Sequence, residues 1–375
     1  MAQAYTPGLQ ITEQTRIVRV RELPLQGKAL VSVGDAVSAN QDVLSAELPG
    51  DLEIVRIADR LGIEPDEVES GLQVRPGVTV TEGQLLCEVK TFFGLFTQSL
   101  KSPLAGTVEF FTSANGHIGI RRPSVPMTVK AYIDGHIVEV VPGHSVTIES
   151  NAAILQGIFG VGGEQLGTVR VLDVGSDEIV NLRTLEKRKA DLPHAILIGG
   201  MTFSVEALRY AALHHVSAVV TGSVDAVTLR EFVGYEIGVS ITGDEPVPFS
   251  FIITEGFGAL PISERAMALA KKTNNKAASA NGTTQVRAGA VRPEVIIPNS
   301  RENQSSSDQE LSATQLAVGA PVRVIRVPYF GKLGIVEALP PSPTLIPTGA
   351  LVRVASIRLD SGETVLVPRA NLELL

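Results

Sequence analysis

HAILIGGMTFSVEALRYAALHHVSAVVTGS, residues 194–223, decides the fold of the central part of this chain. A short apolar run ends in two glycines, an amphipathic stretch of helical period follows, and a second apolar run comes next. Short buried strands that alternate with helices are typical of parallel βαβ units. Because the alternation continues to SERAMALAKKT, we predict a three-layer α/β domain with a mostly parallel sheet over residues 190–298.

The carboxyl ends of these strands are the expected place for a ligand, because ligands of open α/β sheets gather there. Small residues let a ligand approach the backbone, and the helix N-termini that follow favour an anion. Ser204, Asp225 and Ser263 stand at the expected N-cap positions of those helices. We therefore predict that a small anionic ligand binds at Gly199, Gly200, Thr221, Gly222, Ser223, Thr254, Glu255 and Gly256.

A second polar cluster lies in ANGTTQVRAG, residues 280–289. Its side chains suit a phosphate or a carboxylate, and they suit equally a hydrogen-bonded loop that closes the domain. The candidate ligand-binding residues in it are Asn281, Thr284 and Arg287. The sequence contains no dinucleotide fingerprint and no phosphate loop, and no motif requires a cofactor.

The densest glycine cluster is GIFGVGGEQLG, residues 157–167, with Gly160, Gly162 and Gly163 at its centre. A phosphate loop needs a helix directly after it, whereas the following TVRVLDV alternates like a strand. The pattern therefore favours a compact junction, in which glycines permit positive φ and close packing. Phosphate or flavin binding is the alternative that stays open.

The N-terminal part repeats one hairpin pattern three times, in residues 27–48, 71–90 and 134–150. Each copy alternates apolar and polar residues around a turn glycine, and each places a valine three residues after that glycine. The pairs are Gly34 with Val37, Gly77 with Val80, and Gly143 with Val146.

These hairpins, together with KSPLAGTVEFF at 101–111, resemble the barrel-sandwich hybrid of biotinyl and lipoyl domains. The resemblance implies an all-β scaffold over residues 1–175. Within it, the helical spacing of Ile54, Ile57, Ala58 and Leu61 predicts a helical insertion near 54–70. Lys90 is the nearest match to the lysine that those domains modify, but its sequence context differs. We therefore interpret Lys90 as a solvated lysine at the end of a strand, and its covalent modification is the alternative that stays open.

The C-terminal part begins with a polar segment, residues 299–316, that is typical of a flexible linker. PYFGKLGIV, within residues 317–375, resembles the KOW motif of small SH3-like β-barrels. That family binds RNA or proteins, so the resemblance implies an SH3-like barrel that engages a partner. The candidate partner-binding or RNA-binding residues are Arg326, Tyr329 and Lys332.

The composition of the chain excludes several classes of site and of protein. The chain has 375 residues, a formal net charge of -8 and a single cysteine, Cys87, so an intrachain disulfide and a CxxC metal site are excluded. The histidines have no metal-ligand spacing, and neither a signal peptide nor a membrane-spanning run is present. We expect a cytoplasmic protein without a metal site.

Together these parts predict a multidomain α+β protein. The leading interpretation is a non-catalytic binding or assembly factor, whose α/β domain senses a small anionic ligand and whose tail engages a protein partner. Two alternatives stay open: a cofactor-dependent enzyme with its site at the strand ends, and an RNA-binding accessory of transcription or translation.

Overall fold

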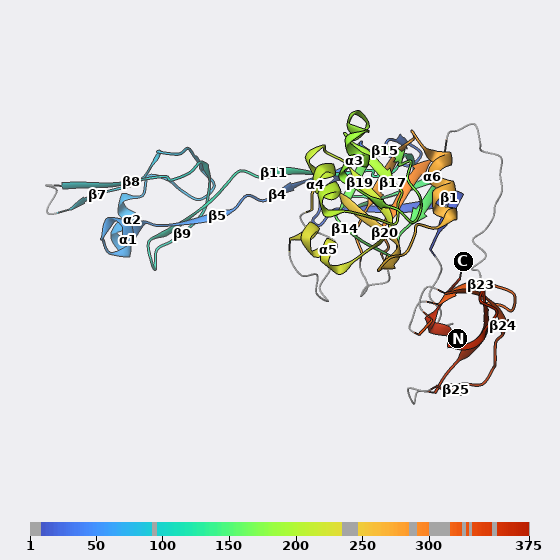
Figure 1. The fold of residues 1–375 in the computed structure, drawn as a ribbon. Helices are drawn as coiled ribbons and strands as arrows, with labels where there is room; N and C mark the ends of the chain where they lie inside the picture. Colours follow the sequence, from blue (N-terminus) through green and yellow to red (C-terminus); the bar gives the residue numbers. More distant parts are fainter. Residues whose placement is uncertain are drawn as a thin grey trace.

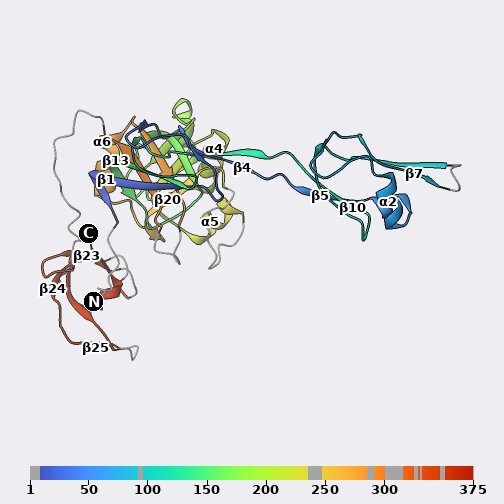
Figure 2. The ribbon, with the colours of Figure 1, turned by 180° about the vertical axis from the view of Figure 1, so that it is seen from behind.

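A computed structural model describes residues 9–91, 96–234, 247–284, 291–299, 316–324, 328–329, 332–346 and 351–374. The described chain is mostly β and has three parts (Figure 1). The body contains a large sheet, the distal lobe comprises residues 52–121, and the half-barrel comprises the strands after residue 320. Both views show the distal lobe standing away from the body on its connecting strands (Figure 2).

The body is built on an eleven-stranded sheet, which has both parallel and antiparallel neighbours. The strands are β1 (Ile11–Glu22), β3 (Ala36–Val37), β12 (Gly135–Val141), β13 (Ser145–Gln156), β14 (Phe159–Val161), β15 (Glu164–Val171), β17 (Ala195–Ile198), β19 (Ala218–Val224), β20 (Ser250–Phe257), β21 (Ala277–Asn281) and β22 (Glu294–Pro298). The order is β14-β20-β19-β17-β15-β21-β22-β13-β12-β3, and β1 also pairs with β13.

The predicted parallel pairing therefore holds for one part of the sheet, which is mixed as a whole: among the described strands, β15, β17, β19 and β20 are parallel neighbours. β21, β22 and β13 continue the sheet in antiparallel pairing. The N-terminal hairpin strands are thus hydrogen-bonded to the strands of the βαβ units. Hydrophobic periodicity identifies strands but not their neighbours, so it could not reveal this continuity.

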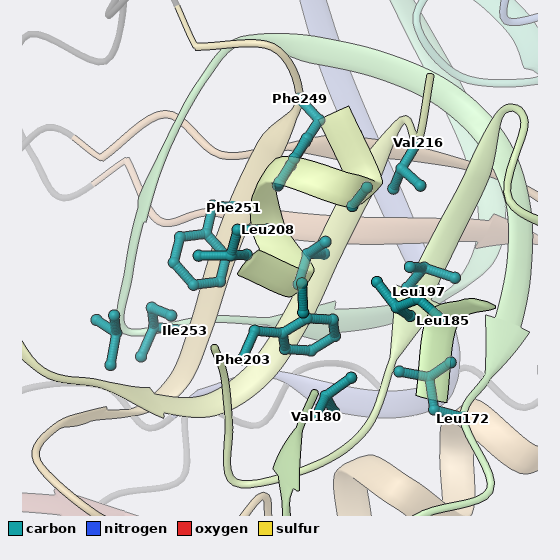
Figure 3. Close-up of a cluster of buried hydrophobic side chains, with 14 of the residues drawn as sticks. Leu172, Val180, Leu185, Leu197, Phe203, Leu208, Val216, Phe249, Phe251 and Ile253 are labelled. Atoms are coloured by element: carbon teal, nitrogen blue, oxygen red, sulfur yellow. The ribbon is translucent and has the colours of Figure 1, made fainter. Parts of the chain in front are cut away.

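Helices cover both faces of the sheet's parallel part. On one face α3 (Leu182–Glu186), α4 (Val205–Leu213) and α5 (Ala226–Val233) pack against the sheet, and Phe203, Leu208 and Phe251 lie in the shared core (Figure 3). The other face packs against α6 (Glu264–Thr273). The remaining elements here are β16 (Ile179–Val180), β18 (Thr202–Phe203) and the 3-10 turn η1 (Lys189–Asp191).

The predicted helix N-caps are confirmed. Ser204, Asp225 and Ser263 each accept a hydrogen bond from a backbone N–H in the first turn of α4, α5 and α6, respectively. These bonds satisfy donors that have no partner within the helix, which is why the helices begin where the sequence indicates.

The hairpin glycines lie in turns, as predicted, and the valines that follow them are buried. All three glycines have positive φ, at 93° for Gly34, 89° for Gly77 and 76° for Gly143. Two of the copies contribute to the body's sheets through β2 (Lys28–Ala29), β3, β4 (Asp42–Leu48), β12 and β13, and β4 pairs with β11 (Val125–Lys130).

The second hairpin copy lies in the distal lobe. The lobe has its own core, in which Val55, Val80, Leu86 and Ile118 are buried. Its elements are β5 (Leu52–Arg56), α1 (Ile57–Leu61), α2 (Pro65–Gly71), β6 (Thr79–Val80), β7 (Leu85–Thr91), β8 (Phe96–Lys101), β9 (Gly106–Thr112) and β10 (His117–Arg121).

The predicted helical insertion starts three residues later than expected. Ile54 belongs to β5, which pairs with β10, and the first helix begins at Ile57. Ile54 satisfies helical spacing in the sequence, but cross-strand pairing with Gly119 decides its conformation. The second helix begins at Pro65 with a capping box between Glu64 and Glu67.

The half-barrel contains a curled five-stranded sheet of order β28-β27-β24-β23-β29. Val322, Val336 and Ile357 lie in its core, and Tyr329 packs against them. The elements are β23 (Pro321–Val324), β24 (Leu333–Ala338), β25 (Thr344–Leu345), β26 (Leu351–Val352), β27 (Val354–Leu359), β28 (Thr364–Pro368), the 3-10 turn η3 (Arg369–Asn371) and β29 (Leu372–Leu374). Apart from its first and last residues, the predicted linker lies outside the described residues.

Among the helices that the structure describes, none has the length and apolar character needed to span a membrane.

Candidate functional site

The eight residues predicted at the strand ends lie at the same end of the parallel strands, following β17 or within β19 and β20. Their hydroxyl groups, however, donate to backbone carbonyls. Thr221 Oγ1 donates to the carbonyl of Gly200 (3.0 Å), and Thr254 Oγ1 donates to the carbonyl of Thr221 (3.2 Å). Ser223 Oγ donates to the carbonyl of Met201 (3.2 Å). These hydroxyls are buried and hold neighbouring strands and loops together.

The loop after β20 covers this strand end. The backbone N–H of Leu260 donates to Ser223 Oγ (3.0 Å). At Gly222 an added Cβ would lie closer than 3.0 Å to backbone atoms of Leu260, Pro261 and Ile262. The glycine is therefore needed for contact with the chain's own backbone, which fills the space that a ligand would need.

Carboxylates already occupy two of the helix N-termini. Asp225 Oδ1 accepts the N–H groups of Val227 and Thr228, both at 2.9 Å, at the start of α5. Glu255 Oε1 accepts the N–H of Ser263 (3.2 Å) at the start of α6. Each helix dipole is thus complemented by a negative side chain, which would repel an incoming anion.

We expect Asp225→Ala to lower the free energy of unfolding by about 1 kcal/mol at pH 7. Hydrogen bonds from Thr228 lower the pKa of Asp225. The ionised carboxylate therefore stabilises the fold above its unfolded pKa of about 3.9, and this contribution is lost as the pH falls through the folded-state pKa. Urea denaturation should show the difference from wild type shrinking towards pH 3. Ser204→Ala, which removes an uncharged cap, should show a difference that does not depend on pH, and equal pH profiles would contradict the account.

Glu255 also binds the half-barrel. Its Oε2 forms an ion pair with Arg323 of β23, and the two side chains are only 9% and 13% exposed. One carboxylate thus links the end of β20, the start of α6 and the half-barrel. The strand end is a contact between two parts of the chain, which sequence reasoning did not anticipate.

The second polar cluster lies at the opposite end of the parallel strands, next to the glycine cluster. Thr284 Oγ1 accepts the N–H of Gly160 (2.8 Å) and donates to its carbonyl (2.9 Å). Asn281 Oδ1 accepts the N–H of Thr283 (2.9 Å). The structure therefore does not bring Asn281 and Thr284 together with the strand-end residues, and Arg287 lies outside the described residues.

The glycine cluster forms β14, a turn and β15, and no helix follows it. Gly162 has φ of +92°, and added Cβ atoms at Gly160 and Gly162 would lie closer than 3.0 Å to neighbouring backbone. Gly163 has nothing within 4 Å of an added Cβ. Tight packing against the chain's own backbone therefore explains why glycine is needed at positions 160 and 162.

A cluster of charged residues was missed by the sequence reasoning. Glu164 and Glu294 each lie opposite Asn281 in the sheet, so the three share one face. Arg21 contacts both oxygens of Glu164 (2.6 and 2.7 Å), and Arg19 Nε contacts Glu294 Oε1 (3.0 Å). Burial tends to lower the pKa of Arg19, but its contact with Glu294 outweighs this, and the pKa is raised. The period-2 arginines of RIVRVRE were the available signal, but the partner carboxylates are far away in sequence.

Tyr132 lies beside these ion pairs. The Arg21 guanidinium stands 5.6 Å from the centre of its ring. Its hydroxyl is buried and has no hydrogen-bond partner among the described residues. Burial raises the pKa of Tyr132 well above its ordinary value of 10.0, and the charges of Glu294 and Glu164 raise it further. The phenol therefore stays protonated at neutral pH.

We expect Tyr132→Phe to leave the free energy of unfolding unchanged or to raise it by about 1 kcal/mol, because the variant buries no hydroxyl without a partner. The ring beneath Arg21 is kept. Urea denaturation followed by circular dichroism measures the change. A loss of more than about 1 kcal/mol would show that the hydroxyl makes a stabilising hydrogen bond.

Other candidate sites give little support for a ligand. No group of three or more potential metal-binding side chains occurs in the part of the chain that the structure describes. An open pocket of about 190 Å³ lies between the hairpin turns and the large sheet, lined by Ile133, Asp134, Leu166, Ser279 and others. It is smaller than typical small-molecule sites, which span roughly 300–1,000 Å³.

The partner-binding candidates in the half-barrel differ in their positions. Tyr329 packs against the core, whereas Lys332 is exposed. Arg326 lies outside the described residues. Lys90, in the distal lobe, is exposed on β7.

The chain matches no protein-family model and none of the curated proteins with which it was compared.

Proposed function

We propose that this chain is a non-catalytic binding and assembly protein. In this proposal a barrel-sandwich scaffold and a three-layer α/β unit hold a KOW-like, SH3-like barrel that engages a protein partner. The observation that carries the proposal is the outer face of the half-barrel. Leu333, Ile335 and Leu366 are exposed there, at 43%, 43% and 58%. Leu333 and Ile335 are two residues apart on β24, and Leu366 lies on the same face beyond β27. Adjacent exposed apolar side chains are typical of protein-binding surfaces.

The strand ends give no support to a catalytic function. A catalytic hydroxyl needs a base to take its proton, but Thr221, Ser223 and Thr254 donate theirs to carbonyls. Glu255 is held by Ser263 and Arg323. Because carboxylates occupy the starts of α5 and α6, the proposal includes no anion site at those two helices.

An RNA-binding function has less support. Stacking on a base needs an aromatic face that is open to the solvent, and Tyr329 packs against the half-barrel core. The outer face carries apolar residues beside Arg323 and Arg358, and both arginines are paired with carboxylates. The geometry thus favours a protein partner.

The test compares the tagged full chain with a chain ending at residue 299, both recovered from extracts of the host. We expect a protein partner to copurify in a fixed ratio with the full chain and to be lost with the truncated chain. Ile335→Asp in the full chain should also abolish recovery, while Lys332→Glu should not. Recovery that survives the truncation, or that nuclease removes, would contradict the proposal.

A further inference from the structure

The contact between Glu255 and Arg323 is made by two distant parts of the chain, the end of β20 and the first strand of the half-barrel. Both side chains are nearly buried, so each has lost most of its hydration, and the ion pair compensates for part of that loss. Arg323 therefore forms a site that holds a carboxylate, and the chain itself currently supplies that carboxylate.

Arg323 belongs to the outer face of the half-barrel. Its neighbours in the strand, Val322 and Val324, point into the core. Arg323 lies opposite Leu333 of β24, and Pro321 lies opposite Ile335. Residues opposite each other in a sheet share a face, so the carboxylate site is continuous with the exposed apolar residues Leu333 and Ile335.

We infer that the half-barrel binds a partner through an acidic side chain flanked by apolar residues, and that Glu255 competes with this side chain for Arg323. The inference rests on the proposed function and names the surface and the partner's chemistry. The partner carboxylate takes the place of Glu255 at Arg323, and its apolar neighbours cover Leu333 and Ile335. When the half-barrel leaves the body, Glu255 regains contact with water and keeps its hydrogen bond to Ser263.

The charges on this face favour a protein carboxylate over a nucleic acid. Arg358, which lies opposite Ile335, pairs with Glu337 (3.4 Å). A phosphate backbone needs several unneutralised cations in a row. On this face, however, the acidic residue Glu373 of β29 lies opposite Arg323, and Arg358 is already paired. One arginine beside an apolar strip fits a single carboxylate.

The competition between Glu255 and the partner should change the affinity of the chain for that partner. Because Glu255 and Arg323 belong to one chain, each meets the other at an effective concentration in the millimolar range. A partner must overcome this contact before it binds. Glu255→Gln removes the competing charge, and its amide oxygen can still accept the hydrogen bond from Ser263. We expect this variant to bind the partner about tenfold more tightly.

The experiment uses the full chain with Arg323→Lys, which keeps the charge and introduces an amine. A carbodiimide joins an amine to a carboxylate in contact with it: the amide C–N bond forms, and the released carboxylate oxygen leaves on the carbodiimide as a urea. Mass spectrometry of the free chain should show a link between positions 323 and 255. Arg358→Lys, on the same face, should instead link to Glu337.

In the doubly substituted chain, Glu255→Gln with Arg323→Lys, that link should disappear. With host extract added, position 323 should link to an aspartate or glutamate of the copurified protein that has apolar neighbours. Absence of the 323–255 link in the free chain overturns the inference. The inference is also overturned by a partner that needs the half-barrel but is linked at another position and binds no more tightly to the Glu255→Gln variant. The proposed function stands in that case. RNA that copurifies with the chain overturns both the inference and the proposed function. A partner that still copurifies with the chain ending at residue 299 overturns the proposed function, even where the 323–255 link is observed.

Discussion

Arg19→Met is expected to lower the free energy of unfolding of the body by about 3–5 kcal/mol. The substitution leaves Glu294 buried without its main charge partner, since this side chain is only 8% exposed. A buried carboxylate that loses its arginine must stay charged at high cost or take up a proton. Urea denaturation followed by far-ultraviolet circular dichroism measures the loss.

Two further variants isolate the cause. Arg19→Met combined with Glu294→Leu removes both charges, and it should recover most of the lost stability, because apolar replacements of buried pairs are often neutral. Arg16→Met removes an arginine of the same strand that is 73% exposed and pairs with Glu149. This exposed pair should contribute at most about 1 kcal/mol. Equal losses for Arg16→Met and Arg19→Met would refute the role given to the buried pair.

Gly222→Ala is expected to lower the free energy of unfolding by about 3 kcal/mol, since an added methyl group meets fixed backbone. The atoms it would meet belong to Leu260, Pro261 and Ile262. Backbone cannot rotate away as a side chain can, so the loop or β19 must shift. Thermal unfolding of the two proteins compares their stabilities.

Gly163→Ala is the matched control for this substitution. An added Cβ at Gly163 has nothing within 4 Å, and its φ is not positive. Its stability should be unchanged or slightly higher, because alanine restricts the unfolded chain. If Gly222→Ala is as stable as Gly163→Ala, the strand end has room for added atoms, as a ligand site would require.

Local features of this fold were predictable from sequence. Asp225 caps α5 because a short polar side chain before an apolar helix has a nearby N–H to accept. Gly77 turns its hairpin because only glycine adopts positive φ without strain. Ile54 is the local exception, since its strand pairing with β10 prevails over helical spacing. The helix cap and the hairpin turn depend on residues that are close together in the sequence, whereas the conformation of Ile54 depends on a distant strand.

Long-range pairing was not predictable in the same way. The hydrogen bonds between β13 and β22 join strands from different parts of the chain, and no periodicity in either strand specifies the other. The same holds for the candidate site. The sequence correctly predicted Thr221 and Thr254 at neighbouring strand ends. It did not predict the carbonyls that accept from their hydroxyls, nor the contact of Glu255 with Arg323 of the distant strand β23.

Paired native and denaturing mass spectrometry of the chain purified from its host tests most directly the claim that it is a binding protein with closed strand ends. We expect a denatured mass equal to that of the 39.7 kDa sequence, and a native mass increased by a protein partner alone. One small molecule per chain, retained under native conditions and lost on denaturation, would contradict that claim.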